Sequence, residues 1–457
     1  MTGKARLASA LKTSLPAALD LASQPVLWLI EAVFIGRLSA AALGGVGFAL
    51  QIILLTVTLL LTFVMGAIIL INRHLGSRNR YQANHVLGQT LMSGFLFSFA
   101  VMIVWYFGAP LLFRLIQENQ SMASVTVTPL SGVASGIQYL RLVSFFAPIL
   151  VLNFIATGML RGSGDTHFSM TLNVGTNIAN VILSPILIYG LLGFPRLEVR
   201  GAALALGISQ TVGLCATVAL LRSRKTVLFL SFRELATPRW PTIKQLFRLG
   251  STTTVEQLVW SIGQVIVTSM VAYLGIRELA VHQLFLRIQA VLSMFYMGFG
   301  MAAMMHIGKH LGANEHHKAE KMGDMMHRMA FVFVIVLLGL MIAFSESFLH
   351  LFIRREDAIL GNYDFTVLFV VFALVQLPKA MNTVITGSLR GAADIKWVMW
   401  TTILGVLLLE LGLNWICAFV FQFGLLGIWT VQGLDEILKS AVNFLRFKCG
   451  KWKEIRL

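Results

Sequence analysis

Long apolar stretches recur along the whole chain, and they constrain its fold more than any other feature of the sequence. A helix needs roughly 20 apolar residues to cross the hydrocarbon core of a bilayer, and twelve such stretches are bounded by charged residues, glycine or proline. Hydrophobic residues make up 57% of the chain and charged residues only 12%, which excludes an ordinary soluble globular protein. We therefore predict an all-α polytopic membrane protein with about twelve transmembrane helices. The stretches cover residues 15–35, 44–71, 85–112, 138–160, 166–193, 201–221, 249–273, 280–307, 329–349, 365–388, 397–421 and 427–445.

The excess of basic residues indicates how the chain is oriented in the membrane. The chain has 36 Lys and Arg residues against 20 Asp and Glu, a formal net charge of +16. If the N-terminus is cytoplasmic, most of these basic residues fall in the two termini and in the loops on the same side, as the positive-inside rule requires. Both termini are therefore expected to be cytoplasmic. The charge then gives no reason to expect a nucleic-acid partner.

The two halves of the chain are copies of each other. His74-Leu75-Gly76 recurs as His310-Leu311-Gly312, and Leu160-Arg161-Gly162 recurs as Leu389-Arg390-Gly391. Each half holds six spans, so the second copy enters the membrane in the same direction as the first. Transporters built from such parallel repeats place their sites between the halves and alternate access by moving one against the other. The predicted domains are a six-helix bundle over residues 1–221, a basic cytoplasmic linker over 222–248 and a second six-helix bundle over 249–457.

Several short motifs are spaced along the spans and loops: Gly36-Arg37-Leu38, Ala42-Leu43-Gly44, the two Leu-Arg-Gly-x-x-Asp loops at 160–165 and 389–394, Asn180-Val181-Ile182-Leu183, Ala280-Val281-His282-Gln283, His310-Leu311-Gly312-Ala313 and Leu434-Asp435-Glu436. In these motifs the chain resembles the multidrug and toxic compound extrusion (MATE) family over nearly its whole length. It is closer to the DNA-damage-inducible-protein-F branch, because Glu256 lies six residues after Gly250.

The resemblance implies a secondary active antiporter. Two six-helix bundles would surround a central cleft and export amphipathic or cationic organic compounds in exchange for H⁺ or Na⁺. It further implies a protein of the cytoplasmic (inner) membrane of a prokaryote, in contact with membrane lipids and without a cofactor apart from the coupling ion. A closed pair of bundles has no need of a partner, so we expect a monomer. The sequence contains no Walker motif or nucleophile elbow, so ATP-driven transport and enzymatic catalysis find no support.

The first span carries a polar face. Asp20, Gln24, Trp28 and Glu31 are spaced by three or four residues, so they share one side of a helix. An acid inside a membrane span is costly to bury and is a functional hypothesis by default. Glu31 stands where the family has an Asp that binds a cation or proton, so the resemblance makes Glu31 the leading coupling residue. The alternative is that Glu31 lies near the outer interface and pairs with Arg37.

The fifth span carries a second polar face, made of Asn173, Asn177, Asn180 and Ser184. Sodium-type members of the family place an Asn and an Asp here, four residues apart, whereas this chain keeps Asn180 and has Ser184 in the place of the acid. A hard cation wants several oxygen ligands including a charged one, while a proton needs a single carboxylate in a dry pocket. This favours H⁺ as the coupling ion. The alternative is that the asparagines only bond packed helices together.

Glu256 is the repeat mate of Asp20, because the two are separated by the same offset as His74 and His310. Both are secondary coupling candidates, and the alternative for each is a structural interhelical hydrogen bond. Three further interpretations are more local: His282 as an interfacial or capping residue, Glu410 paired with Lys379, and Lys439 in a helix-surface ion pair with the acids before it. The candidates for the substrate cleft are Asn173, Asn177 and Ser184 of the fifth span together with Gln24, Trp28, Asn153, His282, Gln283 and Asn382.

Three rival functions stay open on the sequence alone. A Na⁺-coupled multidrug antiporter would use Asn180 and its neighbours. A flippase for a lipid-linked saccharide shares the repeat architecture, but its cleft should hold several basic residues to bind pyrophosphate. A membrane receptor that transports nothing would bind ligands without dependence on pH or ions. No spacing of His, Cys, Asp or Glu suggests a metal site, and Cys215, Cys417 and Cys449 lie far apart.

Overall fold

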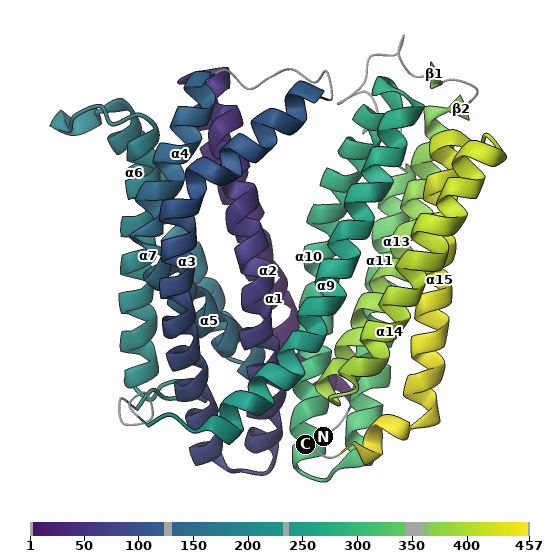
Figure 1. The fold of residues 1–457 in the computed structure, drawn as a ribbon. Helices are drawn as coiled ribbons and strands as arrows, with labels where there is room; N and C mark the ends of the chain where they lie inside the picture. The colour runs from purple at the N-terminus through teal and green to yellow at the C-terminus, as the bar shows by residue number, and fades with distance from the viewer. Residues whose placement is uncertain (1–2, 123–129, 232–236, 344–358, 361–362, 456–457) are drawn as a thin grey trace. The chain divides into compact units, whose positions relative to one another are not determined.

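The structure of the 457-residue protein is a computed structural model that describes residues 3–122, 130–231, 237–343, 359–360 and 363–455. Long helices make up most of it (Figure 1). The first half contains α1 (Gly3–Gly36), α2 (Ala40–Gly76), α3 (Arg80–Met122), α4 (Leu130–Ser144), α5 (Ala147–Ser163), α6 (Thr166–Tyr189), the 3₁₀ turn η1 (Leu191–Gly193) and α7 (Val199–Arg222). The second half contains α9 (Trp240–Leu274), α10 (Ile276–Gly312), α11 (His316–Ala343), the two-residue strands β1 (Ile359–Leu360) and β2 (Tyr363–Asp364), α13 (Phe365–Gly391), α14 (Ile395–Gly405), the π-helical segments η3 (Val406–Leu413) and η4 (Ile416–Val420), α15 (Gly424–Cys449) and the 3₁₀ turn η5 (Lys451–Glu454).

Membrane-spanning helices account for nearly all of the part of the chain that the structure describes. Ten helices are long and apolar enough to cross a bilayer, and the bent pair α4 and α5 raises the number to eleven. The 26-residue α15 is long enough for a further span, but Asp435, Glu436 and Lys439 lower its hydropathy. The predicted all-α polytopic fold is confirmed.

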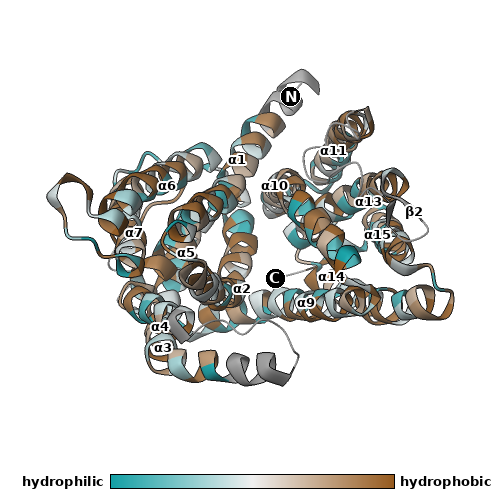
Figure 2. Cartoon of the chain, turned by 90° about the horizontal axis from the view of Figure 1, so that it is seen from above, coloured by the Kyte–Doolittle hydropathy of each residue, from teal (hydrophilic) through white to brown (hydrophobic). Residues whose placement is uncertain are grey.

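Apolar side chains cover the outward faces of these helices, as expected where the surroundings are lipid. Figure 2 shows hydrophobic residues, in brown, over much of each helix. On α3, Ile103, Val104, Phe107 and Leu111 share one side and are between 53% and 72% exposed. Such a surface would aggregate in water. It is the ordinary surface of a membrane span.

The fourth predicted span, residues 138–160, is divided in the structure. α4 and α5 meet at a bend of 66°, with Phe146 as the residue before α5. Pro148 lies in the first turn of α5, and a proline has no N–H to continue the hydrogen-bond ladder of the preceding helix. We therefore attribute the bend to Pro148, whose effect on helix geometry a hydropathy pattern does not include.

Two compact units make up the structure. Unit 1 comprises Met1–Ala18, Asn72–Arg78 and Ser251–Leu457, and unit 2 comprises Leu19–Ile71 and Asn79–Gly250. Three of the four boundaries between them fall inside α1, α2 and α9, and the fourth lies in the turn between α2 and α3. The beginning of α1 therefore packs with the second half of the sequence, while the rest of that helix packs with the first half.

The core of unit 2 is formed where α2, α3, α4 and α7 pack together. Trp105 and Tyr139 are its large aromatic residues, and they are 3% and 1% exposed. The indole Nε1 of Trp105 donates a hydrogen bond to Thr56 Oγ1 at 3.1 Å, so the one polar group of this buried ring is satisfied. Phe113 packs edge-on against Phe48 on α2, with ring centroids 4.7 Å apart.

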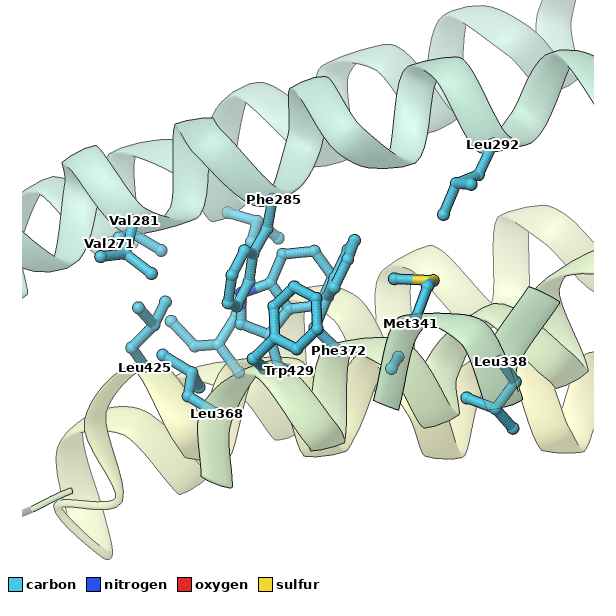
Figure 3. Packing of buried hydrophobic residues seen from close by; sticks show 14 of the residues in the cluster. Val271, Val281, Phe285, Leu292, Leu338, Met341, Leu368, Phe372, Leu425 and Trp429 are labelled. Carbon is cyan, nitrogen blue, oxygen red and sulfur yellow. The ribbon is translucent and has the colours of Figure 1, made fainter. Parts of the chain in front are cut away.

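The core of unit 1 contains a group of aromatic rings (Figure 3). Phe285 on α10 stacks on Phe372 of α13 with centroids 4.5 Å apart, and Trp429 of α15 meets these two rings at 5.4 and 5.1 Å. Each ring comes from a different helix. Their contacts fix the mutual packing of α10, α13 and α15, at roughly 0.5–1.5 kcal/mol per aromatic pair beyond area burial.

The basic segment between α7 and α9 is held on unit 2 by side-chain hydrogen bonds to its backbone. Asp165 Oδ2 accepts from the N–H of Val227 at 2.7 Å, and Asn84 Oδ1 accepts from Phe229 at 2.9 Å. Gln89 accepts from the N–H of Arg239 at 2.8 Å. The sequence pattern predicts a linker here and gives no sign of these contacts.

Candidate functional site

A row of polar side chains joins α1 to α6 within unit 2. Asp20 Oδ2 accepts a hydrogen bond from Ser169 Oγ at 2.5 Å, and its Oδ1 accepts from Asn173 Nδ2 at 2.7 Å. Arg161 Nη1, at the end of α5, lies 3.5 Å from Asp20 Oδ2. The side chain of Asp20 is fully buried. These contacts neutralise its charge and satisfy both of its oxygens, which favours the structural alternative for Asp20.

The same row continues along both helices. Asn177 Nδ2 donates to Ser23 Oγ at 3.0 Å, and Asn180 lies beside the Glu31 carboxylate. Ser184 Oγ donates to Asn180 Oδ1 at 2.9 Å, and the NH₂ group of Asn180, which has no other partner among the described residues, faces the carboxylate. The two polar faces predicted from spacing thus meet each other.

Glu31 differs from Asp20 in having no cation beside it. It is 3% exposed, and its Oε1 makes no hydrogen bond among the described residues. No ion pair to Arg37 is present in that part of the chain, and Arg37 itself is exposed. The alternative of an interfacial Glu31 paired with Arg37 is therefore wrong. A buried carboxylate that no cation neutralises favours binding a proton or a small cation.

Three of the predicted cleft residues lie outside this row. Gln24 and Trp28 on α1 are half-buried, and between Asp20 and Glu31 it is Ser23 that bonds to α6, through Asn177. Asn153 on α5 faces α7, where its Nδ2 donates to Gln210 Oε1 at 2.7 Å and its Oδ1 accepts from Thr217 at 3.2 Å. Asn153 therefore bonds two helices of unit 2 together.

Glu256 on α9 has an equivalent environment in unit 1. Its Oε1 accepts from Arg390 Nη2 at 2.7 Å and from Thr402 Oγ1 at 3.1 Å. Arg390 ends the fourth span of its half, as Arg161 does in the other half, and Thr402 follows it by the same interval at which Asn173 follows Arg161. The pairs of Asp20 with Arg161 and of Glu256 with Arg390 are therefore equivalent in the two halves.

Neither arginine was selected from the sequence as a partner of an acid. A signal for them existed, because Arg161 and Arg390 belong to the repeated Leu-Arg-Gly-x-x-Asp loops and Asp20 and Glu256 are also repeat mates. Two residues that are duplicated together are reasonable candidates for contact. Hydropathy and helix spacing alone could not show it, since each describes one helix at a time.

A second buried polar network lies in unit 1. Its ion pairs differ from those predicted for Lys379 and Lys439. Lys439 Nζ lies 3.3 Å from Glu410 Oε1 and 2.5 Å from Asp435 Oδ2. Lys379 pairs with Glu436 at 3.5 Å, so the predicted pairing of Lys379 with Glu410 is wrong. The pair of Lys439 with Asp435 exists, but both side chains are buried, so it is not a surface pair. Which acid each lysine contacts depends on how α13, α15 and η3 pack together.

Two predicted cleft residues belong to α10 and one to α13. His282 lies seven residues after Gly275, which precedes α10, and is fully buried with its ring 5.6 Å from that of Trp429. The interpretation of His282 as an interfacial or capping residue is wrong, because α10 begins earlier than the predicted span. Gln283, beside it, is half-buried. Asn382 Nδ2 donates to Glu436 Oε2 at 2.9 Å, which attaches it to the network of unit 1.

The buried acids and bases of the described residues suit ion pairing and proton binding. No group of three or more His, Cys, Asp or Glu side chains in that part of the chain could hold a metal ion. Within unit 2 the row from Asp20 to Glu31 offers hydroxyl and amide groups at successive turns of α1 and α6. Such a row can stabilise a carboxylate in either protonation state, because amides donate to the charged form and accept from the neutral form.

These features define a polytopic membrane protein with charged groups buried inside its spans, which is the pattern of membrane transporters. The profile of the MatE family matches residues 16–186 and 253–416. The chain therefore belongs to the MatE family, whose members are transporters and not enzymes. The family resemblance found from the motifs is confirmed, while the assignment to one branch stays a prediction.

Curated relatives cover almost all of the chain. A probable multidrug resistance protein NorM from Thermotoga maritima is 25% identical over 460 residues, which are 97% of this chain and 92% of that protein. An uncharacterized transporter YisQ from Bacillus subtilis is 24% identical over 92% of this chain and 90% of that protein. Both matches cover at least nine tenths of each chain, so the similarity is not confined to a part of the sequence.

Solved structures show the same fold. A multidrug resistance MATE family transporter in an outward-facing conformation has a TM-score of 0.84 at 22% identity, over 97% of this chain and 96% of that chain. A MATE in the bent conformation has a TM-score of 0.86 at 22% identity, over 97% and 95%. A MOP superfamily transporter from Pyrococcus furiosus has a TM-score of 0.84 at 21% identity, over 96% and 95%. The architecture of twelve spanning helices in two bundles is thereby supported.

Proposed function

We propose that this protein exports amphipathic or cationic organic compounds in exchange for H⁺, with Glu31 as the residue that binds the coupling proton. Export would proceed by alternating access between the two bundles of the cytoplasmic membrane of a prokaryotic cell. Relatives that are described as probable multidrug resistance proteins support the substrate class. The choice of ion and residue is supported by the contacts of the buried acids.

One observation carries the proposal. Among the buried acids of the described spans, Glu31 is the one without an ion-pair partner. Asp20 has Arg161, Glu256 has Arg390, and the acids of α15 and η3 have lysines. A proton that binds a carboxylate already neutralised by an arginine would create a net buried charge. A proton that binds Glu31 would remove one.

The surroundings of Glu31 favour H⁺ over Na⁺ as the coupling ion. A sodium site would need several oxygen ligands around the ion. The oxygen of Asn180 already accepts a hydrogen bond from Ser184, and the group of Asn180 that is left for Glu31 is an NH₂ donor. A donor beside a carboxylate suits a proton site, because it can stabilise the deprotonated state without supplying a metal ligand.

The contacts of the basic residues disfavour a flippase for lipid-linked saccharides. Lys379 and Lys439 are bound to acids of their own unit, so they are not available for a pyrophosphate. Arg141 is exposed, and its Nε donates to the backbone oxygen of Tyr106 at 3.2 Å. A binding cleft for pyrophosphate needs cations free to make charge-assisted hydrogen bonds with it.

The test is ethidium efflux from proteoliposomes under an imposed pH gradient and, in separate vesicles, an imposed Na⁺ gradient. Efflux driven by the pH gradient alone is the expected result. Efflux driven only by the Na⁺ gradient would overturn the choice of ion, and an absence of drive from both gradients would overturn the exporter proposal itself.

Matched variants then test Glu31. Glu31→Gln keeps the size of the side chain and removes its charge, so we expect proton-driven efflux to be lost while the protein stays folded. Glu31→Asp keeps the carboxylate and should retain efflux. Glu198→Gln makes the same chemical change at a side chain that is 59% exposed, and it should leave efflux unchanged. Full efflux by Glu31→Gln would remove Glu31 from the mechanism.

A further inference from the structure

The network of unit 1 holds three buried groups that share one position inside the membrane. Glu410 lies on η3, and Asp435 and Lys439 lie one turn apart on α15. Lys439 Nζ contacts both carboxylates, at 3.3 Å to Glu410 Oε1 and 2.5 Å to Asp435 Oδ2. The side chains of the three are 4%, 1% and 7% exposed respectively. We call Glu410, Asp435 and Lys439 the unit 1 triad.

The charges of the triad do not balance. Two carboxylates face one ammonium, so the fully ionised triad carries one negative charge in a region from which water is excluded. Burying an uncompensated charge costs several kcal/mol, and a single bound proton would remove that charge. Among the described residues, the Glu410 carboxylate has one further hydrogen bond, from Gln264 Nε2 on α9 to its Oε2 at 2.9 Å, and an amide adds no charge.

Neighbouring ionised groups do not supply the missing positive charge. Glu436, next to Asp435, is bound by Lys379 of α13 at 3.5 Å and by the Asn382 amide at 2.9 Å. On α9 and α13, Glu256 and Arg390 form their own pair at 2.7 Å. Asp394, before α14, is bound by Arg446 of α15 at 2.8 Å. Each of these carboxylates has its own cation, so the excess negative charge belongs to the triad.

One carboxylate oxygen of the triad, Asp435 Oδ1, is free to bind a proton. Asp435 Oδ1 makes no hydrogen bond in the part of the chain that the structure describes, although Asp435 is 1% exposed. It faces Gly405 at the end of α14, where a Cβ atom would lie 2.5 Å from Asp435 Oδ1 and 2.9 Å from Lys439 Nζ. Because Gly405 has no side chain, the carboxyl group of Asp435 and the ammonium group of Lys439 can occupy this space. A buried polar atom without a partner requires an explanation.

The backbone that carries Glu410 is also unusual. Val406–Leu413 forms a π-helical segment of eight residues directly after Gly405. π-Helical turns are rare and are found most often at functional sites. An ordinary α-helix through the same residues would rotate Glu410 to another side, so this geometry aims the carboxylate at Lys439 and Gln264.

We propose that Glu410, Asp435 and Lys439 form a proton-binding site in unit 1, in which the two carboxylates share one proton beside the ammonium of Lys439. The site would take H⁺ and not Na⁺, because Lys439 Nζ already lies between the carboxylates, where a metal cation would have to bind. Proton binding here needs no other reactant: an oxygen of Asp435 or Glu410 gains the proton and the triad becomes neutral. The inference does not depend on Glu31 being the coupling site.

The experiment is infrared difference spectroscopy of the purified full-length protein during a pH titration. A protonated carboxyl group has a C=O stretching band that an ionised one lacks. The titration is carried out on Glu31→Gln, which removes the carboxyl proposed for coupling in unit 2. In this background the triad should give a carboxyl band at neutral pH.

The triad predicts a pattern across three variants made in that background. Glu410→Gln and Asp435→Asn should each abolish the band, because the carboxylate that remains is balanced by Lys439. Lys439→Gln should do the opposite and enlarge the band about twofold, because two carboxylates without a cation must both be protonated. A band that is unchanged in Glu410→Gln and Asp435→Asn would overturn the proposal. So would a background protein without any such band.

Two variants that keep all three charges of the triad test the proposal if the variants above do not fold. Gln264→Leu removes a neutral donor to the ionised Glu410, so the band should persist to higher pH, and an unchanged titration would contradict a role for Glu410. Lys439→Arg keeps the cation and should keep the band. The proposed function fails separately, through loss of pH-driven ethidium efflux in the unmodified protein. A triad band in that case would show a proton site that is not used for export.

Discussion

Asp20 in unit 2 and Glu256 in unit 1 hold equivalent positions in the repeat and make equivalent contacts. Each is bound by the arginine that ends the fourth span of its half, Arg161 or Arg390. The first pair is more deeply buried: the side chains of Asp20 and Arg161 are 0% and 10% exposed, against 9% and 24% for Glu256 and Arg390. The shared pair is therefore part of the duplicated scaffold, and its depth has diverged.

What the two units do not share is more informative about function. Unit 2 adds Glu31, a buried acid without a cation, and the residue at the corresponding position of the second copy is Val267. Unit 1 adds the triad of Glu410, Asp435 and Lys439 on different helices. The balanced charges are therefore common to both halves, while each half carries its unbalanced charge at a different place.

The largest effect should come from breaking the deeper pair. Arg161→Met leaves Asp20 buried without a cation, and such a change costs about 3–5 kcal/mol of folding free energy. Thermal or SDS-induced unfolding in detergent measures it. Asp20→Asn combined with Arg161→Met should recover a large part of the loss, because the orphaned charge is gone. A loss no greater than that of Arg200→Met, at an exposed arginine, would show that the pair is not structural.

The equivalent change in unit 1 should be milder. Arg390→Met leaves Glu256 with its hydrogen bond from Thr402, and this pair is less deeply buried than that of Asp20 and Arg161, so we expect a loss of about 1–3 kcal/mol. The same unfolding measurement applies. If Arg390→Met destabilises the protein more than Arg161→Met does, burial is not what ranks the two pairs.

The loops after these arginines differ in backbone strain. Gly164 has φ 106° and the repeat-equivalent Ala393 has φ 68°, both in the left-handed region that costs a non-glycine residue roughly 1–2 kcal/mol. Ala393→Gly should therefore raise stability by up to about 1 kcal/mol, and Gly164→Ala should lower it by a similar amount. Melting temperatures that move in the same direction for both variants would contradict this account.

The smallest effect concerns the loops after α2 and α10. His310 Nδ1 lies 2.9 Å from Glu315 Oε2, whereas the repeat-equivalent of Glu315 is Asn79. Hydrogen bonds from Lys318 and His310 lower the pKa of Glu315 below its ordinary 4.5. The stabilisation is therefore present above that value and is lost as the pH falls through the lowered pKa. Glu315→Asn should remove this acid-dependent part of the melting curve, while Glu198→Gln should leave it in place.

Much of the fold follows from the sequence, because hydropathy and charge are properties of single segments. The all-α polytopic architecture, the family and the two polar faces of the first and fifth spans are readable without any structure. The meeting of those faces was implied by their polarity, since neither can face lipid. The bend at Pro148 and the early start of α10 were missed, because hydropathy windows average over the residues that break or begin a helix.

The candidate site was only partly readable. Glu31, Asp20, Asn180 and Glu256 were selected because they are polar and lie inside spans, and the roles proposed for Glu31 stay predictions until transport is measured. The sequence did not predict the residues that contact these polar groups: the contacts of Arg161, Arg390 and Ser23 were found only in the structure. Lys439 was assigned to a helix surface, since sequence spacing cannot say whether a helix face points to solvent or to another helix.

Which residues share a helix face follows from the amino-acid sequence, because helix geometry repeats every 3.6 residues whatever surrounds it. The membrane-spanning character of the chain and the similarity of its two halves follow from it as well. Which cation neutralises which acid, and therefore which charges remain unbalanced, depends on how the helices pack. That choice depends on contacts of a few ångströms between helices far apart in the chain. A carboxylate and its cation attract each other strongly only when packing brings them together away from water.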